Sequence, residues 1–281
     1  MQSVPRIGLA LSGGGVRGLA HIGVLKVLER ENIPVHLLTA TSMGGLIGAA
    51  YAAGLSASEL ETEALRLSNV RQLLPLLDLS SPRRGLFQGN RFAEYIARQF
   101  GERSFDQLRF PLALVAVDIN AGERVILQEG SVLAAVRATS AVPGLFPPVK
   151  RGDQLLVDGG VLDNLPADVA RELGAEVVIA VDVSSDEQTI EPLYHSRLVP
   201  PGLADTINVL WRTMLVMSRE ANRRSLEFGR PDLLIRPPIP SGVTILTGLR
   251  RAGEIISAGE KAMVRALPHL KEILAPGSAS V

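Results

Sequence analysis

The chain has 281 residues, 46% of them hydrophobic, and its 29 Lys and Arg residues balance its 29 Asp and Glu residues. A net charge of zero argues against a nucleic-acid partner, because proteins that bind nucleic acid usually carry a basic excess. The absence of cysteine excludes disulfides and cysteine-based metal sites and fits a reducing compartment.

The first 55 residues predict two strands, each followed by a helix. Ile7–Leu11 and Leu37–Thr41 are short apolar runs of the kind that form buried strands. Helix-forming residues follow over Leu19–Arg30 and over Met43–Ala53. Two strands separated by a helix imply a right-handed parallel crossover.

The rest of the chain continues this alternation. Ser56–Glu59 resembles a capping box that opens a helix, and residues 71–88 read as irregular. Further strands are predicted at Leu112–Ile119 and Arg124–Gln128, which form a hairpin, and at Gln154–Val157, Val177–Val181 and Leu233–Ile235. Further helices are predicted at Phe92–Phe100, Val132–Ala138, Pro166–Leu173 and Asp205–Phe228, and two more close the chain. The pattern predicts one α/β domain over residues 1–281, with helices on both faces of a mostly parallel sheet.

Two stretches bear on the location of the protein. The N-terminal apolar run is too short for a signal peptide, and Gly44–Leu55 is too short to span a bilayer, so we expect a cytoplasmic protein. Residues 184–202 show no clear element and are interpreted as a mobile flap over a binding site, as a loop that touches a membrane, or as a disordered connector.

A glycine-rich loop joins the first strand to the first helix. Gly13, Gly15 and Gly18 match the G-x-G-x-x-G pattern of dinucleotide-binding folds. Such a site needs an acidic residue at the end of the second strand, whereas this strand ends in Thr41 and Ser42 with no Asp or Glu nearby. The dinucleotide interpretation is therefore disfavoured.

The same loop is suited to bind a developing negative charge. Consecutive glycines let several backbone N–H groups point in one direction, at the positive end of the following helix. We therefore predict an oxyanion hole at Gly13, Gly14 and Gly15, continuing through Arg17 and Gly18. The Arg17 side chain would anchor the loop or screen charge.

Ser42 lies where a serine nucleophile is expected. It follows the second strand and opens a helix, which is the setting of the G-x-S-x-G nucleophile elbow. Gly44 supplies the small residue on one side, but Ala40 stands where the pattern has glycine. The alternative role for Ser42 is a helix N-cap.

No histidine has a strong claim to be the base. His269 lies in the last helix, His21 on the first helix, and His36 at the wrong end of the second strand. His195 lies in the irregular segment and is left open by its position.

An aspartate is the better candidate for the base. Asp158 ends a predicted strand and precedes Gly159 and Gly160, which allow close approach to another backbone. Asp163 is its rival, although the sequence after Asp163 is typical of a turn or a helix start.

Together these motifs resemble the patatin-like phospholipase family, including its bacterial members. The resemblance rests on the glycine loop, the Ser42 elbow and Asp158-Gly-Gly, with further matches at 20–24, 85–89, 139–143 and 146–149. It runs from about residue 6 to about residue 166 in the expected order. It implies a three-layer α/β/α fold, a Ser42–Asp158 dyad, and chemistry without a metal or a cofactor.

The resemblance also implies a lipid or other acyl-ester substrate, with transient contact at a membrane surface. No protein partner is predictable from the sequence. A catalytically impaired lipid-binding or regulatory protein with the same fold is the alternative, and Ala40 is its only support in the sequence.

Overall fold

The computed structural model describes residues 5–76, 78, 88–91, 94–95, 101–184, 201–244 and 247–275. Within these residues an eight-stranded, mostly parallel sheet runs in the order β5-β6-β3-β2-β1-β7-β8, and β4 pairs with β3 outside this path. The strands are β1 (Ile7–Leu11), β2 (Leu37–Thr41), β3 (Leu112–Asp118), β4 (Glu123–Leu127), β5 (Val149–Arg151), β6 (Gln154–Asp158), β7 (Val177–Val181) and β8 (Leu233–Ile235).

Helices cover both faces of this sheet. The α-helices are α1 (Ala20–Arg30), α2 (Ser42–Ala52), α3 (Ala57–Leu67), α4 (Val70–Leu73), α6 (Val132–Thr139), α7 (Ala167–Glu172), α8 (Pro201–Gly229) and α9 (Ala252–Ile273). Short 3-10 helices are η1 (Gly15–Leu19), η2 (Leu74–Leu76), η3 (Phe105–Gln107), η4 (Gly159–Val161) and η5 (Leu249–Arg251). No helix in the described ranges is long and apolar enough to cross a bilayer.

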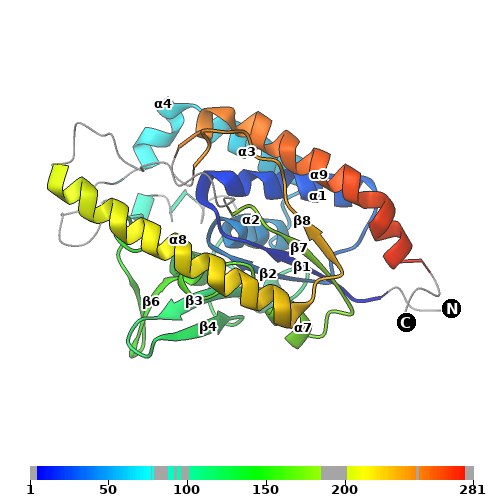
Figure 1. Cartoon of the computed structure of the whole chain (residues 1–281), viewed down its shortest axis with the longest axis horizontal. Coiled ribbons are helices and arrows are strands. Elements are labelled where there is room, and N and C mark those ends of the chain that lie inside the picture. The colour runs from blue at the N-terminus through cyan, green and yellow to red at the C-terminus, as the bar shows by residue number, and fades with distance from the viewer. Residues whose placement is uncertain are drawn as a thin grey trace.

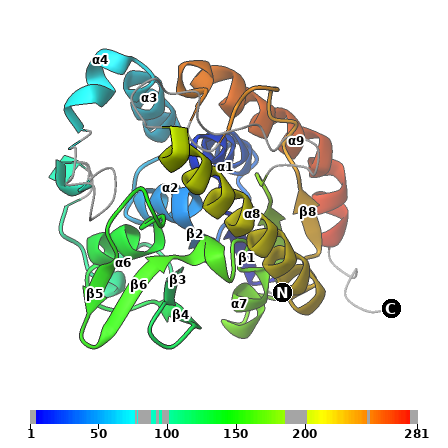
Figure 2. The ribbon, with the colours of Figure 1, turned by 60° about the vertical axis from the view of Figure 1, so that its left-hand side comes forward.

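The alternation of side chains along the buried strands explains why helices pack on both faces of the sheet. In β1, Leu9 and Leu11 pack into the larger apolar cluster with α1, α2 and α9, whereas Ala10 packs into a second cluster with α7. Successive side chains of a strand point to opposite faces, so a strand that is buried on both faces reads as one apolar run. Figures 1 and 2 show α9 packed along α1 on one side of the sheet and α8 on the other. The predicted three-layer α/β/α fold is confirmed.

Most predicted elements are present with small shifts at their ends. β1 and β2 pair in parallel, and β3 and β4 form the expected antiparallel hairpin. Ser56 and Glu59 form the predicted capping box. The predicted helix at 92–100 lies largely outside the described residues, as does the segment 184–202, of which Pro201 and Gly202 begin α8.

Two local predictions were wrong. The region predicted as irregular after residue 70 begins with the short helix α4. The short strand β5 was missed, because its three residues are mostly exposed and carry no apolar pattern. The two predicted closing helices are unequal, because the short 3-10 helix η5 leads directly into one long α-helix, α9, with Pro268 inside it. Met263 and Leu270, on either side of this proline, are fully buried, so tertiary packing holds the helix together across it.

Candidate active site

Ser42 lies at the sharp turn from β2 into α2. Its φ of 54° is in the left-handed region, which non-glycine residues seldom adopt and which is typical of a nucleophile elbow. The turn needs a very close approach of α2 to β1, because a Cβ added at Gly44 would lie 2.6 Å from the Ser12 carbonyl oxygen. Glycine at position 44 therefore allows the helix to start where it does.

Ala40 is accommodated in this elbow. It lies in β2 between Leu11 of β1 and Leu114 of β3, and its methyl group is fully buried in the larger apolar cluster. Ser42 has its strained backbone conformation with this alanine in place. The methyl group is thus part of the core and does not prevent the turn.

Thr139 at the end of α6 supports the elbow from the side. Its Oγ1 accepts a hydrogen bond from the Ser42 N–H at 3.0 Å and donates one to the Val115 carbonyl of β3 at 2.5 Å. One buried hydroxyl therefore ties the nucleophile's backbone to the central strand. Thr139 opens one of the segments that match the family, but no local pattern in the sequence indicates this contact.

Asp158 ends β6 and lies beside Ser42. Its carboxylate accepts a hydrogen bond from the Gly160 N–H at 2.8 Å, and the neighbouring Ser42 side chain acts as a hydrogen-bond donor that lowers its pKa. The side chain is buried, and burial raises the pKa of Asp158 to about 6, against the lowering effect of these two hydrogen bonds. A carboxylate with this pKa is a better proton acceptor near neutral pH than an ordinary aspartate.

The register of the sheet explains why these two residues meet. β3 lies between β2 and β6. Thr41, just before Ser42, pairs with Val115, and Asp158 pairs with the next residue, Ala116. Thr41, which precedes Ser42, and Asp158 therefore end strands on either side of one short stretch of β3. Gly159 permits the tight exit from β6, because a Cβ there would lie 2.4 Å from the Val115 carbonyl oxygen.

The glycine loop lies against Ser42. A Cβ added at Gly13 would be 3.0 Å from the Ser42 Cβ. The Gly13 N–H, however, donates to the Asn164 carbonyl at 3.0 Å, and the Gly13 carbonyl accepts from the Asn164 side-chain amide at 3.5 Å. Asn164 was not predicted as a site residue, and it fixes Gly13 from both sides. Gly13 thus holds the loop in place rather than offering a free donor.

Arg17 anchors the loop from its other end, which was one of its two predicted roles. Its guanidinium donates to the carbonyl oxygens of Val183 (2.8 Å), Ser184 (3.2 Å) and Val243 (3.2 Å). Gly18 serves close packing, because a Cβ there would lie 2.4 Å from Met43 Cγ.

The three described histidines have other roles. His21 is fully buried, and its Nε2 donates to the Ser12 carbonyl at 2.8 Å, while burial lowers its pKa to about 4. His36 Nδ1 accepts from the Ile7 N–H at 2.9 Å, and His269 lies exposed beside Glu272. His195 lies outside the described residues. Across the described ranges no group of three or more metal-ligating side chains is arranged to bind an ion.

The sequence model of the patatin-like phospholipase family matches residues 9–171, which include Ser42, Asp158 and the glycine loop. The chain belongs to this family. It is 42% identical over 196 residues to patatin-like phospholipase domain-containing protein 6 of Mus musculus, which covers 68% of this chain and 14% of that protein. It is 37% identical over 195 residues to an uncharacterised NTE family protein of Mycobacterium bovis, covering 69% and 33% of the two chains.

The matched curated relatives are therefore much longer than this chain, which spans about a seventh of the mouse protein and a third of the mycobacterial one. Among solved structures, the fold is similar to that of VipD from Legionella pneumophila, with a TM-score of 0.53 and 11% identity over 95% of this chain and 67% of that one. This patatin-like protein therefore shares the VipD architecture with little sequence in common.

Proposed function

We propose that this patatin-like protein hydrolyses acyl esters of lipids or lysophospholipids through an acyl-enzyme on Ser42. The placement of Ser42, in its strained turn, beside the buried Asp158 carboxylate, whose pKa it lowers, is the observation that carries the proposal. It joins a nucleophile in a strained elbow to a buried proton acceptor, which is the arrangement that nucleophilic catalysis needs.

In the first half-reaction, Ser42 Oγ attacks the ester carbonyl carbon and its proton passes to Asp158. The tetrahedral intermediate collapses with cleavage of the ester C–O bond, and the proton on Asp158 passes to the leaving alkoxide. In the second half-reaction, water gives a proton to Asp158 and attacks the acyl-Ser42 carbonyl. Collapse returns that proton to Ser42 Oγ and releases the carboxylic acid.

The backbone amides of Gly14 and Gly15 hold the oxyanion in this proposal. The Gly13 amide is occupied by Asn164, whereas those of Gly14 and Gly15 donate to no other described residue. Both lie at the N-terminal end of η1, where the unpaired N–H groups and the helix dipole favour negative charge.

Covalent labelling tests the proposal. A fluorophosphonate probe should modify the wild-type protein, and mass spectrometry should locate the adduct on Ser42. The labelling rate should rise with pH through about 6 and then level off, because Asp158, whose pKa burial raises to about 6, accepts the serine proton only when ionised. A protein that is not labelled, or is labelled at another residue, would overturn the proposal.

The glycine loop gives a second prediction. In Gly14→Val, the added side chain would start 2.8 Å from Val183 Cγ2 and push the loop away from the ester oxygen. Losing one oxyanion donor costs about 10²–10³-fold in kcat, so we expect a fall of about 10²-fold or more in ester hydrolysis. Gly253→Val is the matched control, because a Cβ there meets nothing closer than Leu65 Cδ2 at 3.7 Å. An unchanged kcat in folded Gly14→Val would remove Gly14 from the oxyanion site.

An enzyme that hydrolyses acyl esters of lipids is expected to contact a lipid surface. The described part of α8 supports it with exposed apolar side chains near its middle, at Val209, Leu210, Val216 and Met217. Apolar side chains that gather on one helix surface are suited to meet an interface.

The placement of Ala40 argues against the catalytically impaired alternative. That alternative rested on Ala40, whose methyl group is buried in the core beside an intact elbow. It remains the outcome to accept if Ser42 resists labelling.

A further inference from the structure

The chain between β6 and α7 connects the proposed base to the glycine loop. It begins at Gly159, just after Asp158, and includes Asn164, which holds Gly13. Two threonines of β2 fix it to the nucleophile's strand, at 2.7 Å from Thr39 Oγ1 to the Pro166 carbonyl and at 2.9 Å from Thr41 Oγ1 to the Asp163 carbonyl. This connection therefore touches all three parts of the site.

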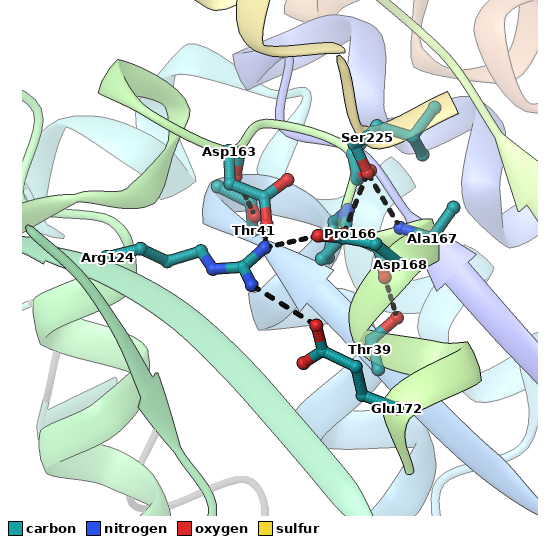
Figure 3. A network of polar contacts seen from close by, with 10 residues as sticks. Thr39, Thr41, Arg124, Asp163, Pro166, Ala167, Asp168, Glu172 and Ser225 are labelled. Carbon is teal, nitrogen blue, oxygen red and sulfur yellow. Dashed lines mark hydrogen bonds and ion pairs between the residues drawn. The ribbon is translucent and has the colours of Figure 1, made fainter. Parts of the chain in front are cut away.

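The Asp163 side chain turns away from these contacts toward β4. Arg124 Nη1 donates to Asp163 Oδ2 at 2.7 Å and to Asp168 Oδ2, in the first turn of α7, at 2.6 Å. Figure 3 shows this guanidinium between the two carboxylates, with Glu172 farther off at 3.7 Å and Ser225 Oγ of α8 bound to Asp168. Arg124 thus links Asp163, in the middle of the chain between β6 and α7, to the first turn of α7.

The Arg124 guanidinium is important because the Asp163 carboxylate beside it is buried. The Asp163 side chain is only 4% exposed, whereas that of Glu172 is 61% exposed and screened by water. Burial, and then the charge of Asp168, raise the pKa of Asp163 to about 7, and Arg124 opposes both effects. A buried carboxylate that loses its cation must either take up a proton or move into water.

We propose that Arg124 is a positioning residue for acyl transfer, acting through Asp163 to hold Asp158 and Asn164 in place around Ser42. The inference rests on the proposed function. The link is short, because the Asp163 N–H donates to the Gly159 carbonyl at 2.8 Å and its own carbonyl accepts from Thr41. If Asp163 moved, the residue after the base and the residue before the nucleophile would each lose a hydrogen bond.

Arg124→Met tests this inference, because methionine keeps an apolar stem of similar shape but removes the charge. The charged groups that face Asp163 are Arg124 from β4 and Asp168 and Glu172 from α7. Without the arginine, Asp163 remains protonated and in place at low pH and becomes an unpaired buried anion at high pH. We expect kcat to fall by about tenfold or more on the alkaline side, with KM little changed, because small misplacements of reacting groups are costly. The plot of kcat against pH should therefore be bell-shaped for Arg124→Met, whereas for the wild type it should reach a plateau.

A second change separates positioning from general damage to the fold. Asp163→Asn in the Arg124→Met background removes the ionisable group and keeps the backbone contact with Thr41, so the alkaline fall should disappear. Arg151→Met is the matched control, because among the described residues the Arg151 side chain pairs only with the exposed Glu129, at 3.3 Å, and the variant should keep the wild-type profile. A folded Arg124→Met protein with the wild-type profile, or a fall that persists in the double variant, would overturn the inference. A wild-type protein that fluorophosphonate does not label overturns the proposed function itself.

Discussion

Ser42→Ala is expected to abolish labelling by fluorophosphonate and to lower kcat for ester hydrolysis by about 10⁶-fold, because no acyl-enzyme can form without the hydroxyl. Alanine has the same Cβ as serine, so the strain of the turn at φ 54° is unchanged and the protein should remain folded. Steady-state hydrolysis of a p-nitrophenyl ester series and a thermal melt measure the two effects separately.

The control for this variant is Ser58→Ala, an exposed serine on α3, which should retain full activity. Substantial hydrolysis by purified Ser42→Ala would show that another residue performs the attack. The same ester series, from short to long acyl chains, defines which acyl length the wild-type protein prefers.

Asp158→Asn should lower kcat by about 10²–10⁴-fold, the usual contribution of a general base. An amide cannot accept the proton of Ser42, although its oxygen can still accept the Gly160 N–H. Because burial raises the pKa of Asp158 to about 6, the folded state favours its protonated form, and the stabilisation that this gives is lost as the pH rises through 6. The neutral asparagine avoids this loss, so Asp158→Asn should melt at or above the wild-type temperature at neutral pH.

Replacement of each histidine provides the contrast. His36 and His269 variants should keep full activity, and the His21 variant should lose only a few-fold, because its Nε2 holds the Ser12 carbonyl next to the glycine loop. A His195 or His269 variant as inactive as Ser42→Ala would contradict the Ser–Asp pair and indicate a Ser-His-Asp triad instead.

Local sequence patterns predicted the features that depend on neighbouring residues. The buried strands, the glycine loop and the serine turn each occupy one short segment, where apolar runs and glycines have direct backbone consequences. Ser42 and Asp158 were predicted as site residues because Ser42 directly follows one such strand and Asp158 ends another. Their meeting was implied by the family resemblance, whereas its geometric cause, the register on either side of β3, is visible only in the structure.

The residues that sequence reasoning missed are those whose partners are far along the chain. Asn164 lies 151 residues from Gly13, and Thr139 lies 97 residues from Ser42. Arg124, 39 residues from Asp163, had been assigned only to a strand. The side chains of Asn164, Thr139 and Arg124 belong to no local sequence pattern. Their contacts can be identified only once the sheet has brought distant parts of the chain together.

The contacts that anchor the glycine loop affect the stage of folding at which the site can form. Val183 N–H donates to Ser12 Oγ across 171 residues, and Arg17 reaches both Val183 and Val243. Contacts of such long sequence separation form late, since much of the chain must be ordered before they close. During synthesis, Ser42 leaves the ribosome long before these anchors exist. The nascent chain should therefore be unable to react with esters until β7 and the segment that contains Val243 have folded into place.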